Sequence, residues 1–179
     1  MQIEYLADRK ELLPELAELH FAEWGQFRPG QSVKDRIDGL ERCSGKAKIP
    51  STVVATDGRE LIGSAMLVTH DMSTRNDLSP WLAGVFVKPP YRKSGIATKL
   101  IERIEQEAAA LETPVLFLYT DKESEFYARR GWKLLERCEY KGLQVAIMTK
   151  ELSPNRSLQG TFDPSPILQP QNGHCLKRP

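Results

Sequence analysis

The sequence lacks the features that mark several large classes of protein. Its three cysteines, Cys43, Cys138 and Cys175, are far apart and form no C-x-x-C pair. That spacing excludes the usual zinc motifs and a disulfide framework, so we expect no metal. No apolar run approaches the ~20 residues that a membrane-spanning helix needs, so we expect no membrane partner.

A leader segment and a charge excess are missing as well. Residues 1–5 hold no basic segment followed by an apolar run, which is the mark of a secretory signal peptide. Together with the unpaired cysteines, this predicts a cytoplasmic protein. The 25 Lys and Arg residues nearly balance the 24 Asp and Glu residues, for a net charge of +1. Nucleic acid is therefore not expected as a partner.

The chain divides into a body and a tail. Its 179 residues, 40% of them hydrophobic, suffice for one domain with a sizeable core. Residues 153–179 contain five prolines, many polar residues and no hydrophobic periodicity. We therefore expect a domain over residues 1–152 and a disordered tail over 153–179.

Hydrophobic periodicity predicts an alternating order of strands and helices in the body. Asp8 is the expected cap of the first helix, Ser32 and Asp35 fit a cap for the second, and Asp57-Gly58 marks a hairpin turn. The middle alternation implies parallel neighbours, and the hairpins imply antiparallel pairs. The predicted strands cover residues 3–6, 52–55, 61–68, 82–87, 115–119, 132–138 and 143–148; the predicted helices cover 8–25, 32–44, 95–111 and 122–130.

The most informative segment covers residues 81–98. It combines an apolar strand, a proline-stiffened turn and a glycine-containing turn that opens a helix. The first backbone N–H groups of a helix have no partner in the helix, and the helix dipole is positive there. Such a turn can hold a phosphate or pyrophosphate, although an ordinary strand-to-helix turn would also place glycine at position 95.

Two motifs together make the chain similar to the GNAT superfamily of N-acetyltransferases. One is the turn Arg-Lys-Ser-Gly-Ile-Ala at residues 92–97, which matches the superfamily's Arg/Gln-x-x-Gly-x-Gly/Ala. The other is Phe126-Tyr127, followed closely by the Gly131-Trp132 pair, and one helix and one strand separate the two motifs. Over residues 1–150 the element order also resembles that superfamily.

The resemblance implies an α/β (α+β) fold with a mixed, mostly antiparallel central sheet of about seven strands and flanking helices. It implies that strands 4 and 5 splay near a bulge at residues 84–86, where the pantetheine arm of acetyl-CoA would pair with the backbone. Acetyl-CoA is then the expected cosubstrate. The residues expected to bind it are Val85, Phe86, Val87, Arg92, Lys93, Ser94, Gly95, Ile96, Ala97, Thr98, Thr120 and Tyr127.

Tyr127 is the candidate catalytic residue that the resemblance implies. A phenol, with a usual pKa of about 10, can assist the departure of a thiolate. The alternative is a core tyrosine that only packs its ring. The sequence also departs from the superfamily: Trp81 and Ala83 stand where many members have a strand glutamate, and Thr120 stands where many have asparagine.

The acceptor site is expected opposite the coenzyme, with His20, Trp24 and Trp81 as its candidate residues. His20 and Trp24 are one helical turn apart and can face one cleft, and histidine has a pKa suited to a base. Packing is the alternative role for all three. The sequence leaves open whether a small-molecule amine or a peptide amine is the acceptor.

These observations favour an acetyl-CoA-dependent N-acetyltransferase that moves an acetyl group to a primary amine by direct attack. Two alternatives stay open: a non-catalytic acyl-CoA-binding regulatory module, and an acyltransferase that uses a longer acyl-CoA. The sequence is compatible with a monomer or a homodimer.

Overall fold

Seven strands and four α-helices form the part of the chain that the structure describes, residues 1–153 of the computed structural model. The predicted tail lies outside these residues, apart from Ser153. The order of the elements follows the predicted one. Short 3-10 turns aside, it is β1 Gln2–Tyr5, α1 Leu13–Trp24, α2 Val33–Arg42, β2 Ser51–Asp57, β3 Glu60–Val68, β4 Trp81–Val87, α3 Ile96–Ala110, β5 Val115–Thr120, α4 Ser124–Ala128, β6 Lys133–Tyr140 and β7 Leu143–Glu151.

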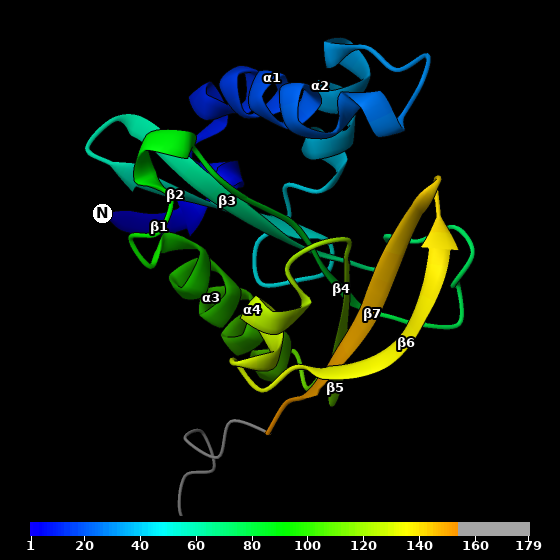
Figure 1. Ribbon diagram of the computed structural model, residues 1–179. Helices are drawn as coiled ribbons and strands as arrows, with labels where there is room; N and C mark the ends of the chain where they lie inside the picture. The colour runs from blue at the N-terminus through cyan, green and yellow to red at the C-terminus, as the bar shows by residue number, and fades with distance from the viewer. Residues whose placement is uncertain (154–179) are drawn as a thin grey trace, which may run out of the picture.

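The strands form one mixed sheet in the order β1-β2-β3-β4-β5-β7-β6. Every neighbouring pair is antiparallel except β4 and β5, which run parallel. Helices α1 and α2 lie on one face of the sheet, and α3 and α4 lie on the other (Figure 1). The α/β (α+β) prediction of a mostly antiparallel seven-stranded sheet is thus confirmed.

The start of the first helix differs from the prediction. Two 3-10 turns, Leu6–Asp8 and Lys10–Leu12, precede α1, whose N-cap residue makes no side-chain capping bond. Pro14 lies in the first turn of α1, where its missing N–H costs nothing and its fixed φ suits a helix. Asp8 instead accepts a hydrogen bond of 2.7 Å from Lys46 Nζ.

Two other local predictions are confirmed. Ser32 and Asp35 form a reciprocal capping box at the start of α2, in which the Ser32 hydroxyl accepts from the Asp35 N–H. The hairpin turn between β2 and β3 comes directly after Asp57 and begins at Gly58, where φ is +59°. Both signals are short-range, which explains why the sequence alone reveals them.

The amphipathic helix α3 packs its apolar side against the sheet, where Leu100, Ile101 and Ile104 are buried. One buried acid interrupts this face. Glu107 is 4% exposed, and its carboxylate accepts a 2.5 Å hydrogen bond from Ser51 and a 2.9 Å bond from Arg103. These bonds anchor α3 to β2 and compensate the burial of the charge.

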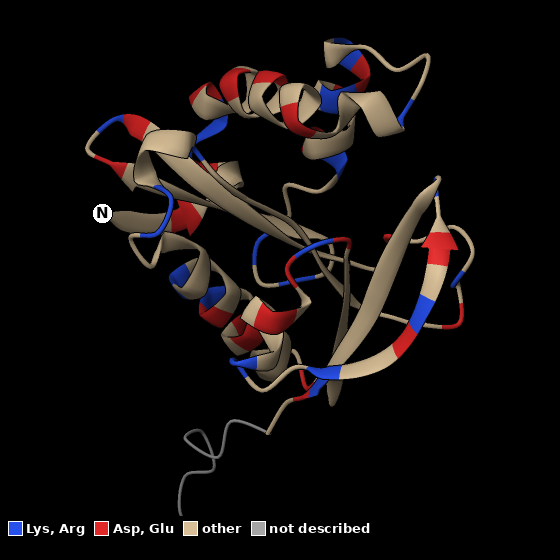
Figure 2. Cartoon of the chain, in the orientation of Figure 1, with Lys and Arg blue, Asp and Glu red and all other residues tan. Residues whose placement is uncertain are grey.

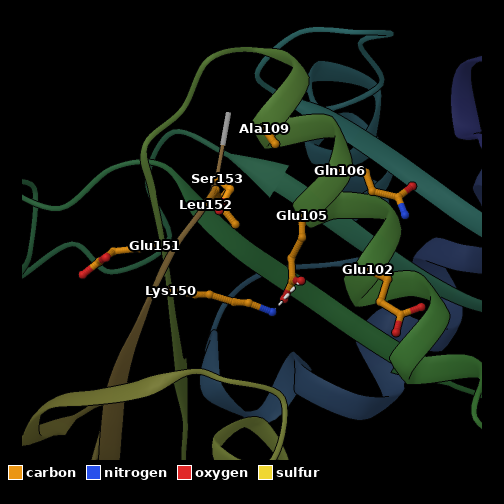
Figure 3. Close-up of a pocket in the computed structure, with 8 residues that line it drawn as sticks. All are labelled: Glu102, Glu105, Gln106, Ala109, Lys150, Glu151, Leu152 and Ser153. Atoms are coloured by element: carbon orange, nitrogen blue, oxygen red, sulfur yellow. Dashed lines mark hydrogen bonds and ion pairs between the residues drawn. The ribbon is translucent and has the colours of Figure 1, made fainter. Parts of the chain in front are cut away.

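The edge strand β6 carries alternating acidic and basic residues, whereas the middle of β7 beside it has none (Figure 2). Charged side chains on an edge strand discourage pairing with other chains. A separate shallow pocket lies between α3 and the end of β7. Lys150 and Glu105, which both line it, form an ion pair at 2.7 Å (Figure 3). Glu105 also accepts from the indole N–H of Trp132, which ties the Gly131-Trp132 motif to α3.

Strand β4 carries a bulge at the predicted place. Its register against β3 shifts between Ala83 and Phe86, opposite Ser64 and Met66. Gly84, in the shifted segment, has φ of +56°, a value that side chains with a Cβ rarely adopt. The Ser64 hydroxyl donates to the Gly84 carbonyl at 3.2 Å, which holds the bulge against β3.

We predict that Gly84→Ala lowers the free energy of unfolding by about 2–4 kcal/mol, because φ becomes strained and a Cβ would lie 2.8 Å from Met66 Sδ. Gly58→Ala is the matched control, because φ is +59° there but no atom lies within 4 Å of the added Cβ. We expect the control to lose only about 1 kcal/mol. Urea denaturation of both variants measures the difference, and equal midpoints would contradict the crowding at Gly84.

Candidate active site

A cleft of about 400 Å³ opens where β4 and β5 separate. Gly84 and Val85 of β4 line one wall, and Tyr119 and Thr120 of β5 line the other. Tyr127 of α4 and residues from the end of α1 complete the walls. The cleft therefore brings together segments that cover opposite faces of the sheet.

The separation of the two strands begins immediately after their first contact. Trp81 and Phe117 are the single register pair between β4 and β5 among the described residues, and the Phe117 N–H donates to the Pro80 carbonyl at 3.0 Å. Beyond this pair, the edge of β4 that faces β5 has no strand partner in residues 1–153. Unpaired strand edges can accept an extended ligand as an additional strand.

The turn between β4 and α3 has the backbone shape of an anion site. Lys93 and Gly95 have φ of +63° and +84°, and Gly95 is the N-cap residue of α3. No side chain caps the first N–H groups of this helix, and an added Cβ at Gly95 would meet nothing within 4 Å. The turn is open above the glycine, with amides and the positive end of the helix dipole beside it.

The Tyr127 ring packs edge-on against Phe126 and Trp132, while the residue lines the cleft. Burial, reinforced by the charge of Glu123 and opposed by Arg130, raises the pKa of Tyr127 to about 12. The phenol therefore keeps its proton at neutral and moderately alkaline pH. It is able to donate that proton or a hydrogen bond into the cleft.

Comparison with a family model decides the identity of this fold and cleft. Residues 10–135, well over half of the chain, match the model described as Acetyltransferase (GNAT) domain. The chain belongs to the GNAT acetyltransferase family. It is therefore an acyltransferase, and the predicted family is confirmed.

Solved structures share the fold of this GNAT chain at low sequence identity. An aminoglycoside 6'-N-acetyltransferase complexed with coenzyme A aligns with a TM-score of 0.69 and 20% identity, over 86% of this chain and 98% of that one. The aminoglycoside 6'-N-acetyltransferase from Enterococcus faecium gives 0.66 and 19%, over 86% and 98%. An acyl-CoA N-acyltransferase from Pseudomonas aeruginosa gives 0.60 and 21%, over 83% and 97%. No curated protein sequence matches the chain.

Two side chains predicted to bind acetyl-CoA form hydrogen bonds to other groups of this GNAT domain. The Arg92 guanidinium donates to the Val87 carbonyl at 2.9 Å and to Glu23 Oε2 at 3.2 Å. The Ser94 hydroxyl donates to the Tyr91 carbonyl. The turn therefore offers an anion its backbone N–H groups and the exposed Lys93, while Arg92 joins the turn to β4 and α1.

Arg130 is a cation near the turn that the sequence analysis missed. Its guanidinium donates to Thr98 Oγ1 from Nε at 3.0 Å and from Nη2 at 2.7 Å, and it lies 3.6 Å from the Phe126 ring centroid. Thr98 is in the first turn of α3, so this contact places a positive charge beside the open amides. The signal that could have indicated Arg130 is its place in the Tyr127 motif, directly before Gly131.

The remaining predicted coenzyme residues lie around the cleft and the turn. Val85 lines the cleft, whereas Phe86 is buried and pairs with Ser64 of β3. Ile96 and Ala97 are the first residues of α3. Thr120 lines the cleft, and its hydroxyl accepts a 3.0 Å hydrogen bond from the Glu123 N–H, so the hydroxyl proton is still available to a ligand.

His20 lies beneath the cleft rather than in its wall, since it is only 1% exposed. Its Nδ1 is 2.9 Å from Arg36 Nη2, and its Nε2 is 2.8 Å from Ser64 Oγ. Because arginine only donates, Nδ1 accepts and Nε2 carries the proton. Burial and the charge of Arg36 hold the pKa of His20 well below its usual 6.5, so this histidine is neutral and structural.

The two tryptophans predicted near the acceptor differ in position. Trp24 lines the cleft and packs edge-on against His20 and Phe86. Trp81 is fully buried, and its indole N–H donates to the Leu78 carbonyl at 2.7 Å. Trp81 lies in the core because its position is the one at which the described residues of β4 and β5 are paired. The side chain therefore offers no surface to an acceptor.

A polar wall that was not predicted from the sequence also lines the cleft. It consists of Arg28, Arg36, Asp71 and Lys141. Burial raises the pKa of Asp71, against the opposing effect of the three cations. These residues come from α2 and three loops, and no short-range pattern joins them.

Two absences apply to residues 1–153. They contain no group of three or more His, Cys, Asp or Glu side chains arranged to hold a metal ion. They also contain no helix of the length and apolar character that crossing a membrane requires.

Proposed function

We propose that this GNAT enzyme transfers the acetyl group of acetyl-CoA directly to a primary amine. The observation that carries the proposal is the edge of β4 beyond Trp81, which has no strand partner within residues 1–153; this edge borders the cleft that Tyr127 lines, and β4 leads on to the open turn at Gly95. A pyrophosphate suits the amides of the turn, and an extended pantetheine arm suits the unpaired strand edge. Arg92 already occupies the Val87 carbonyl, which leaves the Val87 N–H and the Val85 backbone for this pairing.

The chemistry follows from the groups around the cleft. The neutral amine attacks the thioester carbonyl, and the backbone N–H of Val85 or Phe86 stabilises the negative charge that grows on its oxygen. The C–N bond forms, the C–S bond breaks, and Tyr127 gives its proton to the departing sulfur. The proton that the attacking amine loses passes through water and restores the neutral phenol of Tyr127. Neither Cys43 nor Cys138 lines the cleft, so no acyl-cysteine step is included.

We predict that Gly95→Glu weakens acetyl-CoA binding by about tenfold or more, because a carboxylate would enter the seat of the diphosphate. Gly95→Asn is the control, since asparagine tolerates positive φ and adds no charge. Calorimetric titration of both variants with acetyl-CoA gives the two dissociation constants. Wild-type affinity in the glutamate variant would refute the placement of the diphosphate.

We predict that Tyr127→Phe lowers kcat by about 100-fold and changes acetyl-CoA affinity much less, because the ring is kept and the phenol proton is lost. CoA release with a panel of primary amines measures kcat, and Tyr5→Phe, on β1 away from the cleft, is the control. Since the pKa of Tyr127 is about 12, wild-type kcat should show no loss of the acid form between pH 7 and 10.

Three results of the panel would contradict this account. Full activity in Tyr127→Phe would remove the phenol from the mechanism. An alkaline decline below pH 10 that the phenylalanine variant lacks would contradict the high pKa. Tight acetyl-CoA binding by the wild type with no CoA release on any amine would indicate a non-catalytic binding module.

A further inference from the structure

The three cations of the polar wall, Arg28, Arg36 and Lys141, have no carboxylate partner at ion-pair distance within residues 1–153. Arg28 follows the 3-10 turn Gly25–Phe27, Arg36 lies on α2, and Lys141 lies in the turn between β6 and β7. Within residues 1–153, none of these three side chains has an acidic oxygen within 4 Å, whereas Arg9, Arg75 and other arginines of the domain do. Three positive charges from separate segments thus line one cleft without a direct ion pair, and Asp71 of the same wall acts on them only at longer range.

Arg36 is partly buried, and most of its hydrogen-bond donors have no partner within residues 1–153. One of its five donors, on Nη2, bonds to neutral His20, which contributes no negative charge. Its Nε is fully buried and has no hydrogen-bond partner among the described residues. Burial and the nearby charge of Arg28 both lower the pKa of the Arg36 guanidinium. A buried, unpaired guanidinium is costly, and an anion bound in the cleft would offset that cost.

Asp71 is the one carboxylate of the same wall, and it has no ion-pair partner within 4 Å in residues 1–153. The other acidic residues of the cleft belong to α1 and to the loop after β5. Of these, Glu23 contacts Arg92, Asp121 contacts Lys122 at 3.7 Å, and Glu123 lies near Tyr127 without an ion-pair partner in residues 1–153. The wall therefore combines a positive region of three charges with a single negative group.

We propose that the acceptor is a primary amine that also carries a carboxylate close to its amino group. The carboxylate binds to Arg28 and Arg36, with Lys141 adding positive potential, and Asp71 attracts the ammonium before it loses its proton. This assignment rests on the proposed acetyl transfer and names its acceptor class. We therefore expect a carboxylate-bearing amine to be preferred over an aminoglycoside, because its carboxylate would pair with cations that have no ion-pair partner within residues 1–153.

Matched acceptors that differ only in the carboxylate test the assignment. Alanine is compared with alaninamide, and aspartyl-alaninamide with asparaginyl-alaninamide, so that an α-carboxylate and a side-chain carboxylate are separate arms. Kanamycin serves as a polycation. We expect kcat/KM for CoA release to favour at least one carboxylate partner by about tenfold or more over its amide, and over kanamycin.

Variants identify the side chains responsible. We expect Arg28→Gln to abolish the preference for the carboxylate while acetyl-CoA affinity is unchanged, and Arg36→Gln to abolish the same preference. Arg28 is partly exposed and contributes no internal ion pair, so its variant stays informative if Arg36→Gln fails to fold. Arg42→Gln, on the exposed end of the same helix α2, is the control that should retain the preference.

A second readout does not depend on turnover. With CoA present, N-acetylalanine or N-acetylaspartyl-alaninamide should raise the melting temperature of the wild type more than the matching amide does, and Arg28→Gln should cancel the difference. Amides or kanamycin that react as well as the carboxylates would overturn the acceptor class, as would equal melting shifts, while leaving acetyl transfer intact. If acetyl-CoA itself fails to bind, the proposed function fails, and the melting shifts alone then decide whether the arginines bind carboxylates.

Discussion

The bulge of β4 at Gly84 keeps β4 and β5 apart after their single paired position at Trp81 and Phe117. A parallel pair in continuous register would satisfy the edges of both strands and close the sheet. With the bulge in place, the backbone of β4 beyond Trp81 faces a cleft instead of a neighbour. The position of the coenzyme path, of Tyr127 and of the acceptor wall all follow from that divergence.

A chain of hydrogen bonds connects the acceptor wall to this bulge. Arg36 donates to His20, His20 donates to Ser64, and Ser64 donates to the Gly84 carbonyl. The chain crosses from α2 through α1 and β3 to β4, so it fixes the two helices against the strand that bears the proposed oxyanion donor. The same arginine that stabilises the bulge also offers its unused donors to the cleft, which links the position of the acceptor to the geometry of the thioester site.

Short-range patterns in the sequence were enough to predict the helices and strands, the turn at Gly95 and the bulge near Gly84. The left-handed glycine at position 95 and the bulge near Gly84 both follow from local backbone needs and the family motif. The acceptor wall was not predictable in the same way. Arg36 lies on a helix with a solvated face, and Lys141 lies in a hairpin turn, where a single charge usually contacts only water. Only the folded sheet brings these two residues to one cleft.

Burial explains the predictions that changed. His20 and Trp24 share a helical face, as the spacing indicated, but the helix packs so closely on β3 that His20 is covered and Trp24 forms the cleft wall. Only Leu82 and Ala83 separate Trp81 from Gly84 in sequence, yet Trp81 lies where β4 and β5 are paired and is packed against Phe117 and Tyr119. Positions only a few residues apart along β4 thus lie in different environments, one in the core and the other in the cleft wall.

A crystal structure of the complex with acetyl-CoA tests the central claim most directly. The account predicts that the diphosphate contacts the backbone N–H groups of residues 93–98 and that the pantetheine arm lies between β4 and β5, bonded to the backbone of Val85 and Val87. The thioester should then lie beside Tyr127. A coenzyme bound elsewhere, such as in the pocket between α3 and the end of β7, would contradict the account.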